Sequence, residues 1–244
     1  MYKEILSNNY NIIKTKVEEA ARKYNRSPDS IKILAVSKTH KPEVLLQAMS
    51  AGINIFAENY AQEFRDKNKK ILEMLSTPEY NFNKAPDFDF HFIGHLQSNK
   101  VKYLVPFVST IHTVDSIKLA SEINSQAVKN NKIINVLIQI NTSNQESKSG
   151  IEPEAAETLA ENILNFNNIK LLGLMTIGTF SDDETIIRKE FSLLRNTLYN
   201  INSKLELNLT ELSMGMSHDY EIAISEGATM LRIGTAIFGA RKYL

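Results

Sequence analysis

The sequence contains no cysteine, which excludes disulfide bonds, thiolate metal ligands and a cysteine nucleophile. It also lacks an excess of charge of either sign, because 28 lysine and arginine residues are balanced by 28 aspartate and glutamate residues. Such a balance gives no indication of a nucleic-acid or membrane-surface partner. No apolar run approaches the roughly 20 residues of a membrane helix, and the first residues lack the apolar core of a signal peptide. We therefore expect a cytoplasmic protein with neither of these partners.

Short motifs of known chemistry are absent as well. The sequence has neither the G-x-G-x-x-G fingerprint of dinucleotide-binding proteins nor a P-loop. The five histidines form no pair one turn apart on a predicted helix and have no carboxylates at ligand spacing, so no metal site is predicted. Ser217, His218 and Asp219 are consecutive, and consecutive side chains point in different directions. They cannot form the hydrogen-bonded catalytic triad of a hydrolase.

The 244 residues alternate between short apolar runs and amphipathic stretches. The apolar runs predict strands at 33–38, 53–57, 88–94, 109–114, 134–140, 170–177, 211–214 and 230–233. The amphipathic stretches predict helices at 4–24, 42–50, 58–75, 98–105, 116–130, 153–165, 182–203 and 217–226. This alternation predicts one α/β domain over residues 1–244, a (β/α)8 TIM barrel with an extra N-terminal helix. A doubly wound open sheet is the alternative, but it usually has fewer strands and a phosphate fingerprint after the first of them.

The first predicted strand ends in Lys38, at the face where barrels of this type carry their sites. Lys38 is either a solvated strand end or an amine held in a cavity. In a cavity its pKa would fall, and the neutral amine could attack a carbonyl. Turns with Gly215 and Gly234 follow the last two strands, where barrels commonly bind phosphate. Each glycine alone could simply relax a tight turn, but together they favour backbone N–H groups pointing at an anion.

Hydroxyl and cationic side chains accompany these turns. The hydroxyl groups that can donate to a phosphate belong to Ser213, Ser217 and Thr235. The clear or possible cations at the strand ends are Lys38, Arg232, His95 and His112. A lysine, a phosphate site and a planar cation suggest pyridoxal 5'-phosphate, held as a Schiff base on Lys38 with Arg232 facing the pyridine nitrogen. The alternative role of Arg232 is a structural ion pair at the barrel rim. His91 alternates within a strand and is interpreted as a barrel-lining residue.

Motifs along nearly the whole chain resemble those of the pyridoxal phosphate homeostasis proteins, a family related to the N-terminal domain of alanine racemases. Two of them are Leu34-Ala35-Val36-Ser37-Lys38-Thr39 and Arg232-Ile233-Gly234-Thr235-Ala236-Ile237-Phe238-Gly239. The others lie at 56–63, 91–100, 112–115, 136–141, 148–150, 173–175 and 212–217. The motifs occur in the family's order, and their combination is far more specific than any one of them.

The resemblance implies a fold-type III barrel that carries or regulates pyridoxal phosphate and so serves vitamin B6 homeostasis, without an established catalytic reaction. The cofactor-binding residues that it implies, together with the turn motif, are Lys38, Asn59, Ser213, Met214, Gly215, Arg232, Gly234 and Thr235. Apo forms of pyridoxal phosphate enzymes are the expected partners, and we expect a monomer. The alternative is a small racemase-like enzyme. Racemisation needs a base on each face of the substrate carbon, and Tyr60 is the nearest candidate for the second base.

Overall fold

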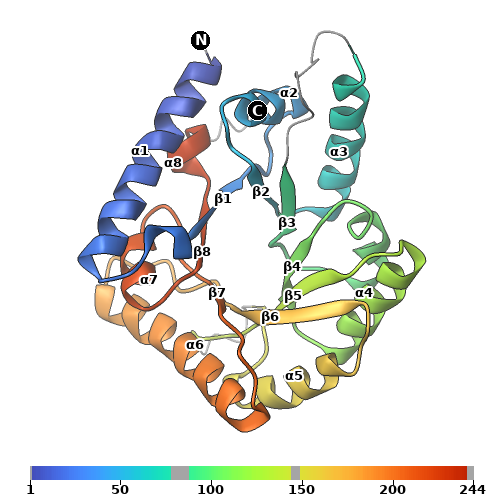
Figure 1. Ribbon diagram of the computed structural model, residues 1–244, viewed down its shortest axis with the longest axis vertical. Helices are drawn as coiled ribbons and strands as arrows, with labels where there is room; N and C mark the ends of the chain where they lie inside the picture. Colours follow the sequence, from blue (N-terminus) through green and yellow to red (C-terminus); the bar gives the residue numbers. More distant parts are fainter. Residues whose placement is uncertain (1, 78–87, 144–148, 241–244) are drawn as a thin grey trace.

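The structure is a computed structural model that describes residues 2–77, 88–143 and 149–240. Its parallel strands form one closed barrel in the order of the sequence, with β1 hydrogen-bonded to both β2 and β8 (Figure 1). The strands are β1 (Lys32–Val36), β2 (Ile55–Glu58), β3 (Asp89–Phe92), β4 (Thr110–Val114), β5 (Ile134–Gln139), β6 (Ile169–Met175), β7 (Glu211–Ser213) and β8 (Met230–Ile233). The predicted TIM barrel is confirmed.

Helices surround the barrel and cover its outer face (Figure 1). They are α1 (Tyr2–Lys23), α2 (Pro42–Ser50), α3 (Ala61–Leu75), α4 (Ile117–Lys129), α5 (Ala156–Leu164), α6 (Glu184–Leu205), α7 (Tyr220–Ser225) and α8 (Thr235–Phe238). Short 3₁₀ helices in the described part of the chain are η1 (Pro28–Ser30), η3 (Ser98–Tyr103) and η4 (Pro153–Ala155). The extra N-terminal helix α1 is present as predicted and packs against α2, α7 and α8, which brings the two ends of the described chain together.

Local signals explain where several helices begin. Pro42 occupies the first turn of α2, where its missing N–H costs nothing. The side chains of Ser116 and Asp183 accept backbone N–H groups at the starts of α4 and α6. The observed bounds differ from the predicted ones by a few residues at several elements. The larger differences are that residues 98–103 form a 3₁₀ helix, α3 begins at Ala61 rather than at residue 58, α7 begins at Tyr220 rather than at residue 217, and α8 was not predicted. Most of the predicted loop 77–86, and half of that at 141–150, lies outside the described residues.

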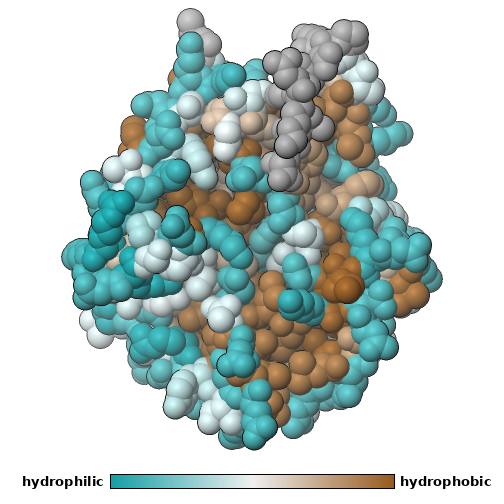
Figure 2. Space-filling view, viewed as in Figure 1, coloured by the Kyte–Doolittle hydropathy of each residue, from teal (hydrophilic) through white to brown (hydrophobic). Residues whose placement is uncertain are grey.

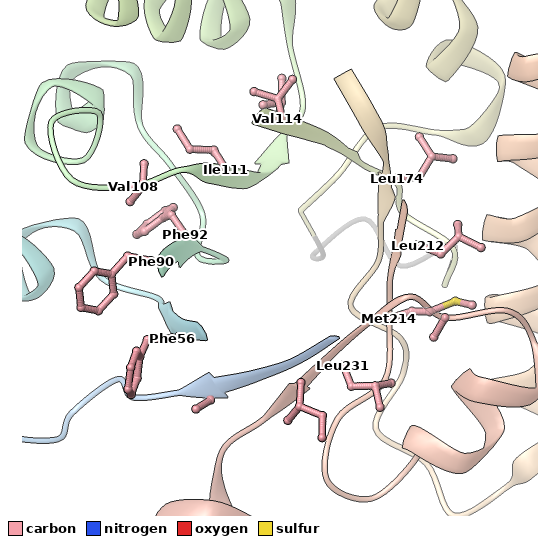
Figure 3. Packing of buried hydrophobic residues seen from close by; sticks show 14 of the residues in the cluster. Phe56, Phe90, Phe92, Val108, Ile111, Val114, Leu174, Leu212, Met214 and Leu231 are labelled. Carbon is pink, nitrogen blue, oxygen red and sulfur yellow. The ribbon is translucent and has the colours of Figure 1, made fainter. Parts of the chain in front are cut away.

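Two apolar layers hold the barrel, one on each side of the strands. The larger layer fills the space between strands and helices, and Figure 3 shows Phe56, Phe90, Phe92 and Leu231 pointing into it. The smaller layer lies inside the barrel and consists of Leu34, Ala57, Ile93, Leu137, Met175 and Met230. Side chains along a strand alternate between the two faces of the barrel wall. The polar side chains at inward-facing strand positions therefore share the interior with this small cluster.

The outer surface is mixed in character. Figure 2 shows hydrophilic residues over most of the outline of this face, with hydrophobic residues gathered toward its lower centre, near β6 and α5 of Figure 1. Among the residues that the structure describes, no helix combines the length and the apolar character needed to span a lipid bilayer.

Candidate functional site

A cavity of about 390 Å³ opens at the carboxyl ends of the strands. It is lined by Val36, Lys38, Asn59, Ile93, Ile177, Phe180, Met216, Ser217, His218, Arg232, Gly234 and Thr235. Of the predicted site residues, the fold thus brings together Lys38, Asn59, Arg232, Gly234 and Thr235. These residues come from the ends of β1, β2 and β8, which are neighbours in the barrel.

The other three predicted residues, Ser213, Met214 and Gly215, do not line this cavity. Ser213 is fully buried and points into the barrel, whereas Met214 belongs to the outer apolar layer (Figure 3). Gly215 has φ +94°, and a Cβ atom there would lie 2.5 Å from the Cβ of Ala223. Their part in phosphate binding stays a prediction, and their positions indicate packing against the barrel and α7.

The loop that carries Lys38 is fixed by buried charges. Thr39, the next residue, has φ +69°, which is strained for a β-branched side chain. Its N–H donates to Oε1 of Glu63 at 2.6 Å. The buried Nζ of Lys67 contacts that same oxygen at 2.8 Å and donates to the carbonyl oxygen of Ser37 at 2.9 Å. Both sides of Lys38 are therefore tied to α3.

Glu58, at the end of β2, completes this cluster. Its Oε1 accepts hydrogen bonds of 2.7 Å from both Lys67 Nζ and Ser37 Oγ. Burial raises the pKa of the Glu58 carboxyl above its ordinary value, although Lys67 and Ser37 act in the opposite direction. Its Oε2 is buried without a hydrogen-bond partner in the described part of the chain. This carboxylate therefore depends on Lys67 for compensation of its charge.

Arg232 is a buried cation that lines the cavity. Its guanidinium donates to Ser213 Oγ at 2.9 Å and to the carbonyl oxygen of Thr176 at 2.8 Å. The group has more N–H donors than these two contacts use, so donors remain for a ligand. Burial lowers the pKa of Arg232 to about 10, while the carboxylate of Asp219 acts to raise it. The guanidinium therefore stays charged near neutral pH.

Residues after β6, β7 and β8 also line the cavity. The hydroxyl oxygens of Ser217 and Thr235 lie 3.4 Å apart. Asp219 accepts the N–H of Met216 at 2.5 Å and contacts His218 Nε2 at 3.2 Å. The sequence analysis did not identify Val36, Ile93, Ile177, Phe180 and His218 as site residues. Ile177 is the last residue of the strand predicted at 170–177, and Phe180 follows it in the next loop, so a search that included the end of this strand and the loop after it would have found both.

Two predicted histidine roles can be compared with the structure. His91 is buried in the barrel, as predicted. His112 was considered as a cation at a strand end, and this interpretation is wrong. It is the third residue of β4 and fully buried, and burial, with the neighbouring charges of His91, Arg232 and Lys32, holds its pKa well below the ordinary value. Among the residues that the structure describes, no group of three or more histidine, aspartate and glutamate side chains could hold a metal ion.

Comparison with known proteins gives one consistent family. Residues 8–242 match the family described as alanine racemase, N-terminal domain. A pyridoxal phosphate homeostasis protein of Aquifex aeolicus is 40% identical over 228 residues, which cover 93% of this chain and 95% of that protein. The crystal structure of an unknown protein from Bifidobacterium adolescentis is 38% identical, with a TM-score of 0.87, and the match covers 97% of this chain and 96% of that one.

A further solved structure carries a ligand. PipY of Synechococcus elongatus, solved with pyridoxal phosphate bound, is 29% identical with a TM-score of 0.77, and the match covers 91% of this chain and 100% of that one. The chain therefore belongs to the family of pyridoxal phosphate homeostasis proteins, built on the fold of the alanine racemase N-terminal domain.

Proposed function

We propose that this protein binds pyridoxal phosphate in the cavity, attached covalently to Lys38, and serves pyridoxal phosphate homeostasis by holding and releasing the cofactor. The observation that carries the proposal is that Lys38 and Arg232 line the same cavity as Gly234 and Thr235. The names of the curated relatives and the ligand in PipY support the same cofactor.

The residues present fit this cofactor. The volume of about 390 Å³ lies within the range of small-molecule sites. Its walls supply apolar contacts for a ring from Val36 and Ile93, and hydroxyl donors for a phosphate from Ser217 and Thr235. When bound, pyridoxal phosphate supplies an aldehyde that reacts with amines and a ring that can withdraw electrons. The Lys38 amine would bond to the aldehyde carbon, and the Arg232 guanidinium would face the ring nitrogen.

The charge of Arg232 favours holding the cofactor over catalysis. Arginine keeps its proton, so it would leave the pyridine nitrogen unprotonated and weaken the ring as an electron sink. Tyr60, the candidate for a second base, is half exposed and lines a separate cavity of about 210 Å³. None of the described residues that line the main cavity is a tyrosine.

Replacing Lys38 by alanine is expected to abolish the covalent adduct. The purified native protein is incubated with pyridoxal phosphate, reduced with borohydride and digested, and the modified peptide is identified by mass spectrometry. Lys41→Ala is the matched control, because Lys41 lies exposed in the same loop. We expect the peptide that contains residue 38 to carry the reduced adduct in the native protein and in Lys41→Ala. In Lys38→Ala the same peptide should carry no adduct. An unchanged adduct in Lys38→Ala would show that another amine holds the cofactor.

A second candidate function is a racemase-like reaction, and one contact favours it. His218 lines the cavity and lies 3.2 Å from the buried carboxylate of Asp219, an arrangement that suits a histidine base. The two functions are separated by mixing the loaded protein with an apo pyridoxal phosphate enzyme and by assaying the loaded protein alone with L-alanine. We expect the apo enzyme to become active and no D-alanine to form. Formation of D-alanine that His218→Gln abolishes, without transfer, would reverse this ranking.

We also propose that the acceptors of the cofactor are apo forms of such enzymes and that the protein acts in the cytoplasm as a monomer. The balanced charge of the chain gives no indication of a nucleic-acid partner.

A further inference from the structure

A row of hydrogen bonds crosses the barrel interior and ends at Arg232. We call its five side chains the buried relay. They are Asp89, His91, His112, Ser213 and Arg232. In that order the contacts are 3.1 Å from Asp89 Oδ2 to His91 Nε2, 2.8 Å from His91 Nδ1 to His112 Nε2, 2.9 Å from His112 Nδ1 to Ser213 Oγ, and 2.9 Å from Ser213 Oγ to Arg232.

The buried relay runs from one end of the barrel toward the other. Asp89 is the first residue of β3, and its side chain is 43% exposed. His91, His112 and Ser213 are buried, on β3, β4 and β7. Arg232, on β8, lines the cavity at the carboxyl ends of the strands. The four side chains other than Asp89 are buried inside the barrel, where each polar atom needs a partner.

The chemistry of the end groups sets the direction of the hydrogen bonds. Arginine can only donate, so Ser213 Oγ accepts from Arg232, and its single hydroxyl hydrogen is available for His112 Nδ1. A neutral His112 then carries its hydrogen on Nε2 and donates to His91 Nδ1. His91 in turn donates from Nε2 to the Asp89 carboxylate. Burial acts to raise the pKa of Asp89, but the hydrogen bonds from His91 and Ser109 outweigh it, so the pKa lies below its ordinary value and the group is an acceptor. In this direction every contact has one donor and one acceptor.

We propose that His112 is a positioning residue that, as the Nε2–H tautomer, orients Ser213 and through it holds the guanidinium of Arg232 in the cavity. The proposal rests on the proposed function where it concerns the cofactor, because Arg232 is the group for the ring nitrogen. It also gives Ser213 a role in place of phosphate binding, since both its hydrogen and its lone pair toward Arg232 are already used.

The tautomer is tested on the full-length protein without cofactor. Two-bond ¹⁵N–¹H correlation spectra of protein labelled at histidine separate protonated from unprotonated ring nitrogens, and the chain has five histidines to assign. We expect His112 to carry its hydrogen on Nε2, and Ser213→Ala to shift its Nδ1 resonance because that nitrogen loses its donor. Hydrogen on Nδ1 of His112, or an Nδ1 resonance that Ser213→Ala leaves unchanged, overturns the proposal.

The effect on Arg232 is tested with a matched pair of variants on protein loaded with pyridoxal phosphate. His112→Asn keeps an acceptor near the position of Nδ1, whereas His112→Phe keeps the ring and loses the acceptor. We expect His112→Phe to release pyridoxal phosphate about tenfold faster and to shift its absorption maximum, and His112→Asn to stay within about twofold of the native rate. Ser213→Ala serves in place of His112→Phe if the latter does not fold.

The outcomes separate the two proposals. If the native protein fails to bind pyridoxal phosphate, the proposed function is wrong, and the spectra of the cofactor-free protein alone decide on the buried relay. If the native protein binds and His112→Phe matches it in release rate and absorption, or if the Phe and Asn variants change equally, the positioning role of His112 is overturned.

Discussion

Replacing Lys67 by methionine is expected to lower the free energy of unfolding by about 3–5 kcal/mol, because it leaves the Glu58 carboxylate buried without a compensating charge. Lys67 Nζ has three acceptors, on Glu58, Glu63 and the backbone of Ser37. Methionine fills a similar volume but satisfies none of them. Urea denaturation of the native and variant proteins measures the loss. The loop that carries Lys38 is expected to lose its position along with the ion pair.

The pH dependence of this loss tests its cause. Without Lys67 the pKa of Glu58, already raised by burial, rises further. A carboxyl with a raised pKa in the folded state binds more protons there than in the unfolded state, so stability falls as pH rises through the interval between the two pKa values. We therefore expect a smaller loss at about pH 5 than at about pH 8.

Two further variants complete this test. Glu58→Gln in the Lys67→Met background is expected to recover part of the stability, because it removes the unpaired buried charge. Glu63→Gln alone is expected to cost less, since the Glu63 side chain is partly exposed and its ion pair with Lys67 is better screened. Equal losses at both pH values, together with no recovery in the double variant, would assign the effect to packing alone.

The barrel could be predicted from the sequence because each strand is a short apolar run and each run is followed by an amphipathic stretch. β8 was predicted with its observed bounds because Met230 and Ile233 lie between two glycine-containing turns. α8 was missed for a physical reason. It has four residues, one turn, and a periodicity of 3.6 residues cannot be recognised in so short a segment.

The location of the site was also predictable, but its internal contacts were not. Lys38, Asn59 and Arg232 lie at or just after strand ends, and barrel topology brings such residues to one face. The contact between His112 and Ser213 joins residues 101 positions apart. Alternation along a strand predicts which face a residue occupies, but not which side chain it meets across the barrel.

Lys67, on α3, is a second residue whose contacts could not be predicted from the sequence. Its neighbours on α3 are mostly charged, so the sequence there indicates a solvated face. Its burial follows from Glu58, which belongs to β2 and is itself buried. Only the packing of α3 on the end of β2 shows that this lysine is part of the support for Lys38.

Replacing Gly234 by alanine is expected to weaken binding of pyridoxal phosphate at least tenfold while leaving the free energy of unfolding within about 1 kcal/mol of the native value. Gly234 has φ −112°, which alanine adopts without strain. A Cβ atom there would meet the Cβ and the carbonyl oxygen of Val36 at 3.5 Å, an ordinary contact. The same atom would occupy space beside the cavity through which an anion approaches the backbone.

Gly215→Ala is the matched control, for which we expect the opposite result: lower stability with little change in binding. Its φ of +94° is strained for alanine, and the new Cβ would lie 2.5 Å from the Cβ of Ala223 on α7, so we expect a loss of about 2–5 kcal/mol of stability. Because Gly215 does not line the cavity, the protein that remains folded should keep a Kd for pyridoxal phosphate near the native value. Equilibrium dialysis and urea denaturation of both variants measure the two quantities separately. A native Kd in Gly234→Ala would remove that residue from the phosphate site, and a weakened Kd in folded Gly215→Ala would return the turn after β7 to it.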